Sequence, residues 1–503
     1  MFKFLQLIII LFVTISIAPI KGEAASQLAI GAVKANGIKA YSQPKQGSAV
    51  VAVLQKGEEY PVLTTLAGDS ADVVVHIVTA GESLSVISKR YNVPVNELQK
   101  ANSLTSTKIL VGQKLKIPQV YKIHSVVQED TLSALAKKYG VSQSDITKLN
   151  RLSSSIIQIG RKLNIPDYYI QVQLLGGKNG WVKKSQLSQK TQSRIVMGWK
   201  FKGTAASYSA QLNHENLNVV SPRWYTLADS GNFVAISADT KYLETAHNNG
   251  KQVWPLIGNL FDPQLTDKVL RNAASRQKLV SALRDSLAAT NSDGINVDFE
   301  NIDPKNKQDY VNFITELKNA IQPYGMKVAV DVTRENGDPF WSGSLDRKKL
   351  GNIADYIIMM GYDEHWGNSP VAGSVASMPW VKEGLELLMK DVPSHKIVLA
   401  VPFYTREWVT DLDTKEVKSI DRTMPEVEKI ISAKNLKKIW KPETGQYYVE
   451  YTVNKEKHQI WIEDQKSITL RMNQVKQYHL GGAAAWYIGS ETPDIWDVYH
   501  FNE

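Results

Sequence analysis

Eight consecutive residues decide the fold of this chain: Asp293-Gly294-Ile295-Asn296-Val297-Asp298-Phe299-Glu300. Apolar side chains at 295, 297 and 299 alternate with Asn296, Asp298 and Glu300, which is the period-two pattern of a β-strand with its polar groups on one face. Two carboxyls and an amide on one buried face are costly unless they are paired. One interpretation is an edge strand that turns this face to water. The other is a catalytic acid at the carboxyl end of a strand, beside a second carboxyl that tunes its pKa.

The length and composition indicate a globular protein of several domains. A chain of 503 residues is too long for one core and suggests about three or four domains. The net charge of +9 and the pI near 9.1 favour an acidic partner, which an anionic cell wall or lipid surface satisfies as well as nucleic acid does. No compact cluster of Lys and Arg with interleaved aromatic residues is present, so we expect no nucleic-acid partner.

The chain has no cysteine, which excludes disulfides, thiolate catalysis and Cys-ligated zinc. Its nine histidines are scattered, without an HExxH motif or another paired-ligand spacing. We therefore expect no metal site and no cofactor.

Residues 1–24 have the pattern of an export signal. Lys3 supplies the positive charge, residues 5–20 form an apolar run, and Gly22-Glu23-Ala24 offers small residues for cleavage. An uncleaved membrane anchor is the alternative, because the run is nearly long enough to span a bilayer. No second apolar stretch of spanning length follows. We expect a mature monomer without a transmembrane span, secreted or associated with the cell wall or spore outside the cytoplasm.

Residues 27–74 alternate short apolar runs with turn residues, which predicts a small β-barrel. This segment resembles the first half of a bacterial SH3-like domain but lacks the Gly-Trp-Val strand that ends it. That ending appears at residues 167–188, as Gly180-Trp181-Val182 after an apolar strand. We therefore expect one SH3-like barrel that is split by an insertion, which exposed loop tips tolerate. Two unrelated hairpins are the alternative.

The inserted stretch is an internal repeat. Five residues recur 48 positions later: Leu84, Tyr91, Asn102, Gly112 and Pro118 as Leu132, Tyr139, Asn150, Gly160 and Pro166. Each copy predicts a strand, two helices and a closing strand. The copies, at 75–118 and 121–166, closely resemble LysM modules, which bind glycans that contain N-acetylglucosamine, such as peptidoglycan and chitin. A tandem pair gains avidity on a polymer. The second copy lacks the glycine-containing turn at residues 125–130, which puts its sugar groove in question.

From residue 192 to 503, apolar strands alternate with helical stretches, as in a parallel α/β fold. Eight strands are predicted, at 194–199, 217–221, 253–258, 294–300, 327–332, 356–362, 397–402 and 482–487. This number fits a (β/α)8 TIM barrel. About eighty residues separate the last two strands, more than one connection needs. We therefore expect residues at about 406–475 to form a lobe above the C-terminal face of the barrel.

Catalytic groups of such barrels lie at the C-terminal ends of the strands. The residues at the predicted C-terminal strand ends are therefore expected to lie together. They are the two acids of strand four, Tyr362 and Asp363 after strand six, Tyr404 after strand seven and Trp486 in strand eight. Carboxyls for acid and base work and aromatic faces for stacking suit a sugar substrate. Four further tryptophans fit a cleft-lining role and a packing role equally: Trp199, Trp224, Trp341 and Trp366.

Four motifs in this order resemble glycoside hydrolase family 18, the chitinase-like family. They are residues 293–300, similar to its DGxDxDxE signature, then Met360-Gly361-Tyr362-Asp363, Pro402-Phe403-Tyr404 and Gly481-Gly482-Ala483-Ala484-Ala485-Trp486. The resemblance implies three catalytic residues, Glu300, Asp298 and Tyr362. It also implies a substrate-binding set: Trp486, Asp363, Tyr404, Met360 and Asn296.

The mechanism that the resemblance implies retains configuration without an enzyme nucleophile. Glu300 protonates the leaving oxygen, while the 2-acetamido oxygen of the substrate attacks the anomeric carbon and forms an oxazolinium ion. Asp298 holds the acetamido N–H, Tyr362 bonds the acetamido oxygen, and Trp486 forms the floor. Water then opens the ion with Glu300 as base.

The chain departs from the family pattern at Asn296, where an aspartate usually shares a proton with the next acid. An amide still hydrogen-bonds there but cannot ionise. We predict that Asn296→Asp changes the pH dependence of the reaction rather than abolishing activity, and identical pH–rate profiles would contradict this.

The leading hypothesis is an exported retaining β-N-acetylglucosaminidase that acts on peptidoglycan of the wall or spore cortex. A chitinase is the alternative within the same class, because LysM modules and the barrel both accept chitin. A lectin without catalysis is the alternative from another class, although lectins of this fold usually lack the acid that Glu300 supplies.

Overall fold

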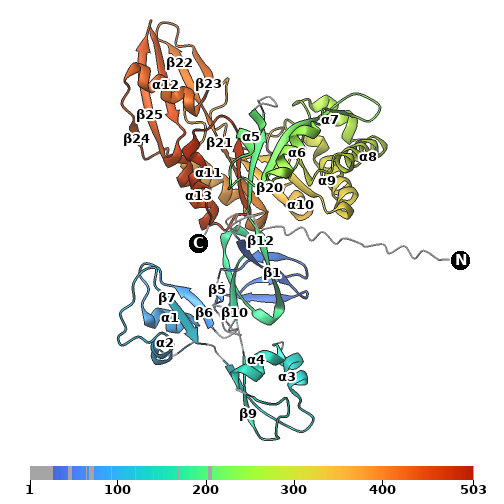
Figure 1. The fold of residues 1–503 in the computed structure, drawn as a ribbon, viewed down its shortest axis with the longest axis vertical. Coiled ribbons are helices and arrows are strands. Elements are labelled where there is room, and N and C mark those ends of the chain that lie inside the picture. The colour runs from blue at the N-terminus through green and yellow to red at the C-terminus, as the bar shows by residue number, and fades with distance from the viewer. Residues whose placement is uncertain are drawn as a thin grey trace, which may run out of the picture.

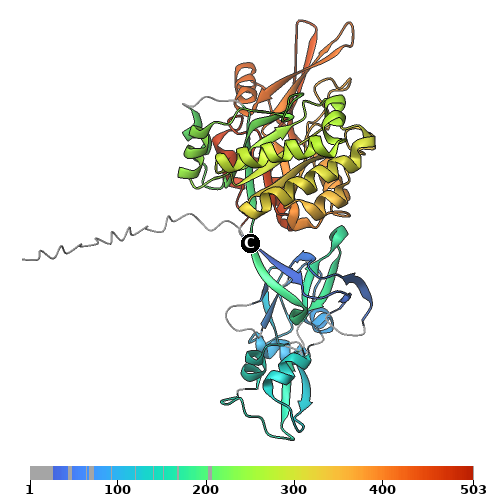
Figure 2. The same cartoon turned by 90° about the vertical axis from the view of Figure 1, so that its right-hand side faces the viewer.

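The computed structural model describes residues 27–501 apart from 44–47, 64, 67–72, 92, 94, 119–120, 140, 151, 167–168 and 202–206. The expected export signal at 1–24 lies outside the described residues. Figures 1 and 2 show the barrel and its lobe in the upper part of the molecule, with a small β-domain and the two repeats below. Within the described ranges, no helix is long and apolar enough to cross a membrane.

Eight parallel strands close into a barrel, which confirms the predicted fold. They are β13 (Ile195–Lys200), β14 (Val219–Leu227), β17 (Leu256–Gly258), β18 (Gly294–Asp298), β19 (Lys327–Thr333), β20 (Tyr356–Met360), β21 (Ile397–Pro402) and β27 (Gly482–Trp486). Each strand pairs in parallel with the next, and β13 closes the barrel by pairing with both β14 and β27.

The third predicted strand, 253–258, is broken into β16 (Gln252–Val253) and β17. Pro255 lies at the break, and proline has no N–H to donate to a ladder. The second strand runs on to Leu227 and forms an antiparallel pair with β15 (Val234–Ile236).

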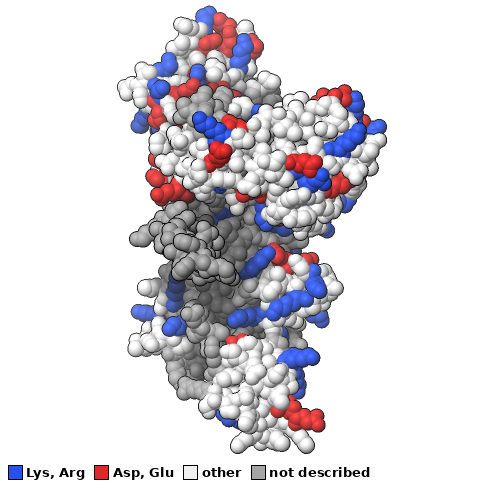
Figure 3. All heavy atoms as spheres, turned by 45° about the vertical axis from the view of Figure 1, so that its right-hand side comes forward, with Lys and Arg blue, Asp and Glu red and all other residues white. Residues whose placement is uncertain are grey.

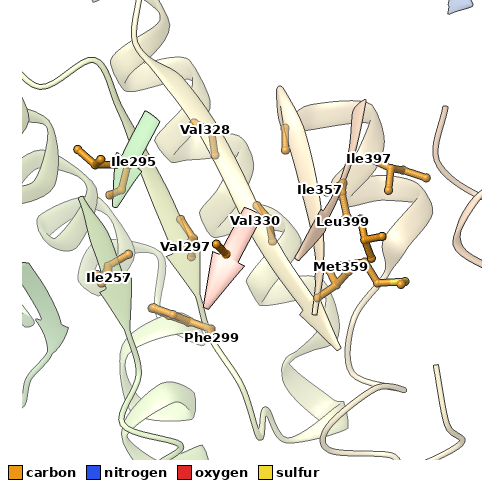
Figure 4. Packing of buried hydrophobic residues seen from close by; sticks show 14 of the residues in the cluster. Ile257, Ile295, Val297, Phe299, Val328, Val330, Ile357, Met359, Ile397 and Leu399 are labelled. Carbon is orange, nitrogen blue, oxygen red and sulfur yellow. The ribbon is translucent and has the colours of Figure 1, made fainter. Parts of the chain in front are cut away.

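The barrel strands are apolar on both faces because each face is buried. Side chains such as Val297, Val330 and Leu399 point outward and pack against the helices (Figure 4). A second cluster, which includes Met197, Trp199 and Ile358, fills the barrel interior.

The helices around the barrel are α5 (Tyr208–Leu212), α6 (Thr240–Asn248), α7 (Pro263–Leu270), α8 (Ala273–Ala289), α9 (Lys307–Ile321), α10 (Arg347–Ile353), α11 (Met378–Leu388) and α13 (Gln465–Gln477). Several begin at a side chain that accepts a hydrogen bond from a free backbone N–H of the first turn: Asp239 for α6, Asp262 for α7, Asn272 for α8 and Asp464 for α13.

A lobe follows strand β21. It contains β22 (Tyr404–Asp411), β23 (Val417–Thr423), α12 (Met424–Lys434), β24 (Ile439–Lys441), β25 (Gln446–Val453) and β26 (Glu456–Ile462). The strands form an antiparallel sheet in the order β23-β22-β26-β25-β24, and α12 packs on one face of it through Val427 and Ile431. The expected insertion at about 406–475 included α13, but this helix packs on α11, β21 and β27 as part of the barrel wall.

Strands from both sides of the repeats form one small β-domain. β1 (Gln27–Val33), β2 (Ile38–Tyr41), β3 (Val50–Leu54) and β4 (Glu59–Pro61) precede the repeats, whereas β10 (Tyr169–Gln173), β11 (Asn179–Lys183) and β12 (Leu187–Ser193) follow them. The two sheets, β12-β1-β4 and β10-β11-β2-β3, each combine strands from the two segments. The repeats are therefore an insertion into this domain, and its SH3-like identity stays a prediction.

The two repeats have the same fold. The first contains β6 (Val73–Ile77), α1 (Leu84–Tyr91), α2 (Val95–Ala101) and β7 (Lys114–Pro118), with β5 (Thr65–Leu66) added beside β6; the second contains β8 (Tyr121–Ser125), α3 (Leu132–Tyr139), α4 (Gln143–Leu149) and β9 (Lys162–Pro166). In each, the outer strands pair antiparallel. The first repeat shares its core with the small β-domain, where the rings of Tyr91 and Trp181 meet edge to face at 5.3 Å.

The small β-domain contacts the N-terminal end of the barrel. Gly176 N donates to Met389 O at 2.7 Å, Gln192 Nε2 donates to His395 O at 2.9 Å, and Ser394 Oγ donates to Gln173 Oε1 at 2.8 Å. The C-terminal ends of the barrel strands lie at the opposite end.

The surface charge of the upper part is mixed. On the face drawn in Figure 3, Lys and Arg side chains lie interspersed with Asp and Glu over the barrel and the lobe. On this face of the barrel and the lobe, the Lys and Arg side chains therefore form no single positive patch.

Candidate active site

Strand β18 turns its polar residues into the barrel. Ile295, Val297 and Phe299 pack outward (Figure 4), so strand alternation turns Asn296, Asp298 and Glu300 inward. The edge-strand interpretation is wrong, because β18 pairs with β17 on one side and β19 on the other. Asn296 is fully buried, whereas Asp298 and Glu300, nearer the barrel mouth, stay partly exposed.

The two carboxyls at this strand end have raised pKa values. Burial raises the pKa of Asp298 to about 6, against the opposing positive charge of Arg223. Burial, and then the negative charges of Asp298 and Asp363, raise the pKa of Glu300 well above its usual range. Glu300 therefore keeps its proton to higher pH than an ordinary glutamate does, while Asp298, with a pKa of about 6, is mostly ionised at neutral pH. A general acid beside a charged partner needs this division.

Asp331 is a third acid of the site and lies on the neighbouring strand β19. The sequence interpretation did not include it among the site residues. Its Oδ1 accepts a hydrogen bond from Asn296 Nδ2 at 2.7 Å. Asn296 Oδ1 accepts from Trp199 Nε1 at 2.7 Å and from Ser221 Oγ at 3.2 Å. Asn296 was expected to bind substrate, but it is completely buried and bonded to three protein side chains. We correct its place to a support behind the site.

Aromatic rings face the carboxyls from the other side of the barrel. The rings of Tyr362 and Trp486 stack with centroids 6.4 Å apart at an interplanar angle of 26°, and Tyr404 meets Tyr362 edge to face at 6.4 Å. Burial, and then the negative charges of Asp331 and Asp298, raise the pKa of Tyr362, so its hydroxyl stays a hydrogen-bond donor. Trp486 is partly exposed at the end of β27 and offers a face on which a sugar ring can stack.

The lobe contributes a wall next to Asp363. Tyr404 OH donates to Asp363 Oδ1 at 2.6 Å, and Arg406 Nη2 donates to the same oxygen at 2.8 Å. Arg406 also pairs with Asp421 of the lobe. These bonds hold Asp363, a half-exposed residue in a left-handed backbone conformation, at the junction of barrel and lobe. Met360, the last residue of β20, is buried, and its contact with the substrate stays a prediction.

Asn259 holds the backbone of Glu300, which lies just beyond the last residue of β18. Asn259 Oδ1 accepts a hydrogen bond from Glu300 N at 3.1 Å, and Asn259 Nδ2 donates to Glu300 O at 2.7 Å and to Thr266 Oγ1 at 2.9 Å. Asn259 is 1% exposed, so these bonds are shielded from water. One side chain therefore fixes both polar backbone groups of the candidate acid.

We predict that Asn259→Ala lowers both stability and activity. The free energy of unfolding should fall by about 1–3 kcal/mol, because buried backbone groups of Glu300 lose their partner. Glycan hydrolysis should fall further than this instability explains, since the acid is no longer held in place. Denaturant unfolding and steady-state kinetics measure the two effects. Asn272→Ala, which removes the exposed N-terminal cap of α8, is the control: it should destabilise the protein similarly and leave kcat unchanged. Equal kcat values for the two variants would contradict the role of Asn259.

The structure distinguishes the four tryptophans that the sequence left open. Trp199 is buried in the barrel interior and Trp224 in the outer core. Trp341 and Trp366 are 38% and 55% exposed, and Phe261 packs beside Trp341 with ring centroids 5.9 Å apart. Trp341 and Trp366 are therefore the two whose faces are open to a ligand.

Three residues of the site were missed by the sequence interpretation. Asp331 had a visible signal, because it is an acid at an inward position of the otherwise apolar run Val328-Ala329-Val330-Asp331-Val332. Asn259 and Arg406 had none, since an amide in a loop and a cation in a strand occur throughout the chain. Their roles depend on which residues the fold places next to them.

Comparison with known proteins identifies similar chains. The model of glycosyl hydrolases family 18 matches residues 183–491, and that of the LysM domain matches 76–118 and 124–166. The chain is 27% identical over 315 residues to the uncharacterized glycosylase YvbX of Bacillus subtilis (strain 168), which covers 60% of this chain and 89% of that protein. It is 26% identical over 449 residues to the putative sporulation-specific glycosylase YdhD of the same strain, covering 85% and 98%.

Solved structures share the fold. The spore cortex-lytic enzyme SleL of Bacillus megaterium QM B1551 matches with a TM-score of 0.56 at 19% identity, over 85% of this chain and 97% of that one. A chitinase from Chromobacterium violaceum ATCC 12472 matches with a TM-score of 0.56 at 21% identity, over 61% and 98%.

Proposed function

The chain belongs to glycosyl hydrolases family 18, and on that premise we propose that it is an exported retaining glycosidase that cleaves β-1,4 bonds after N-acetylglucosamine in peptidoglycan. The observation that carries the proposal is the pair of neighbouring inward acids at the end of β18, Asp298 and Glu300, whose pKa values burial raises, together with the stacked rings of Tyr362 and Trp486. The wall or the spore cortex is the proposed location of the substrate, and a monomer outside the cytoplasm is the proposed form of the enzyme.

In the first step Glu300 donates its proton to the leaving glycosidic oxygen. The N-acetylglucosamine whose anomeric carbon carries the scissile bond uses its own 2-acetamido oxygen to attack that carbon. The bond from the anomeric carbon to the leaving oxygen then breaks. The product is an oxazolinium ion with a positive charge. No enzyme carboxylate has to act as nucleophile, so Asp298 is available to offset that charge.

Asp298 and Tyr362 hold the acetamido group during this attack. The carboxylate accepts the acetamido N–H, and the Tyr362 hydroxyl donates to the acetamido oxygen. Asp298 Oδ1 is buried and has no hydrogen-bond partner among the residues that the structure describes, which suits an atom that receives a donor from the substrate. Trp486 supports the ring from below. In the second step ionised Glu300 takes a proton from water, which opens the oxazolinium ion.

The LysM pair anchors the enzyme on its polymer in this proposal. The missing glycine of the second copy does not change its turn, because Glu129 adopts φ 71°, close to the 84° of Gly81 in the first copy. A non-glycine residue pays conformational energy there. The shape of the turn is kept, and sugar binding by the second copy stays a prediction.

The experiment that tests the function uses the purified protein and a Glu300→Gln variant on three substrates: spore cortex, vegetative peptidoglycan and chitin oligomers. New reducing ends are identified by mass spectrometry after borohydride reduction. N-acetylglucosamine at the reducing ends of cortex or peptidoglycan fragments, absent with the variant, is the expected result. Cleavage of chitin alone would replace the proposal by a chitinase, which the shared barrel and LysM pair favour as the second candidate. Binding without cleavage by the parent would favour a lectin.

A further inference from the structure

Asp331 lies beside Asp298 on the inner face of the barrel. Strands β18 and β19 pair in parallel with Asn296 opposite Ala329 and Val297 opposite Val330. The next inward position on each strand therefore brings Asp298 and Asp331 to one level. Asp331 is 2% exposed. Within the described part of the chain it forms no ion pair, and its hydrogen-bond partner is Asn296.

The orientation of Asn296 identifies the accepting oxygen of Asp331. The indole N–H of Trp199 can only donate, so the amide atom that accepts it is Oδ1. Nδ2 therefore points to Asp331 and donates to its Oδ1 at 2.7 Å. With one oxygen of Asp331 committed as an acceptor, the other oxygen, Oδ2, is the atom that can carry a proton.

We propose that Asp331 is a positioning residue that stays protonated on Oδ2 in the active enzyme, and that this neutral acid keeps Asp298 as the single anion of the pair. Two carboxylates side by side in a buried site would repel each other without a cation between them. In the family pattern an aspartate at position 296 shares this proton. Here the acid is on strand β19, and the amide of Asn296 holds it in place.

The charges around the pair agree with this assignment. The titratable and charged groups that face it are Glu300 after β18, Tyr362 and Asp363 after β20, Tyr404 on β22, Tyr310 on α9 and Arg223 on β14. Burial raises the pKa of all three tyrosines, so they stay neutral. Burial, and then the negative charge of Asp298, raise the pKa of Asp331 well above its usual range.

Two substitutions separate a neutral hydrogen-bonding role from a charged one. Asp331→Asn has the shape and donor of a protonated acid, so kcat/KM should fall by only about threefold. Asp331→Ala leaves the Asn296 amide without its acceptor and opens a gap beside Asp298, so kcat/KM should fall by about a hundredfold. Asp285→Asn, a matched change on an exposed carboxyl of α8, should have no effect. Equal losses in Asp331→Asn and Asp331→Ala would overturn the proposal, because they would show that the negative charge of Asp331 is needed.

Two readouts need no substrate. Infrared difference spectra between the parent and Asp331→Asn should show the carbonyl band of a protonated carboxylic acid near neutral pH, separate from the band that Glu300→Gln removes.

A carboxyl whose folded pKa is raised contributes stability below its unfolded pKa and loses it as pH rises toward the folded pKa. The stability of the parent should therefore fall with pH more steeply than that of Asp331→Asn, by the slope of one bound proton. Absence of both differences would overturn the proposal.

The inference rests on the proposed glycosidase function only for its kinetic test. If the parent cleaves none of the three glycans, the glycosidase proposal fails, while the infrared and unfolding measurements still decide the state of Asp331.

The proposal also gives a direction to the expected effect of Asn296→Asp. An aspartate at position 296 would be a fourth acid beside Asp298, Glu300 and Asp331. Its negative charge would raise the pKa values of Asp298 and Glu300, so both limbs of the pH–rate profile should move to higher pH. Combining Asn296→Asp with Asp331→Asn returns the cluster to its original number of acids and should bring the profile back toward that of the parent. A double variant that keeps the shifted profile would contradict the exchange of roles between positions 296 and 331.

Discussion

Glu300→Gln is expected to lower kcat/KM by about three orders of magnitude on every glycan that the parent cleaves. Glutamine has the shape of the acid but no proton to give to the leaving oxygen, and it cannot act as base toward water. The loss should be smaller with an aryl glycoside of N-acetylglucosamine whose leaving group departs without protonation. Initial rates on both substrate types measure the difference.

Unfolding must not explain this loss. The pKa of Glu300 is raised in the folded protein, so its carboxyl destabilises the fold as pH rises above the unfolded value. The Glu300→Gln variant should therefore melt at the same temperature as the parent near pH 4 and at a higher one at neutral pH. Glu416→Gln, a matched change on an exposed carboxyl of the lobe, should alter neither property. Full activity of the Glu300→Gln variant would remove Glu300 from the mechanism.

Asp298→Asn is expected to lower kcat by about a hundredfold, because the neutral amide no longer offsets the positive charge of the oxazolinium ion. The pH–rate profile should change as well. The parent should lose activity as pH falls through about 6, where Asp298 takes up a proton. The variant should lack this acid limb.

The alkaline limb offers a second test of the same variant. The negative charge of Asp298 is one cause of the raised pKa of Glu300. Its removal should lower the pKa of Glu300, so the alkaline limb should move to lower pH. Profiles of kcat/KM for parent and variant on one soluble oligosaccharide measure both limbs. An alkaline limb that stays in place would show that the two acids do not interact as the structure indicates.

Sequence patterns within single segments predicted much of the fold. Barrel strands are continuous apolar runs because both faces are buried, and the helices between them have their own period, so all eight strands were located from sequence. The break of the third strand at Pro255 and the extension of the second strand to Leu227 were missed. The extension depends on pairing with β15, which the alternation within one segment does not show. Similarly, the two segments of the small β-domain lie about a hundred residues apart, and only their shared sheets show that they are one unit.

By itself, the sequence determined which strand carries the acids and that Asp298 and Glu300 face inward, since alternation along one strand is a local property. Tyr362, Asp363, Tyr404 and Trp486 were also predicted from the sequence, because they stand at the C-terminal ends of predicted barrel strands. Only the tertiary structure decided what surrounds them: that Asn259 holds the backbone of Glu300, that Arg406 reaches Asp363, and that Asp331 meets Asn296. Each of these contacts joins different strands or loops, and their register is set by closure of the whole barrel. The physical reason is that a pKa depends on burial and neighbouring charge, which are properties of the folded interior and not of any one segment.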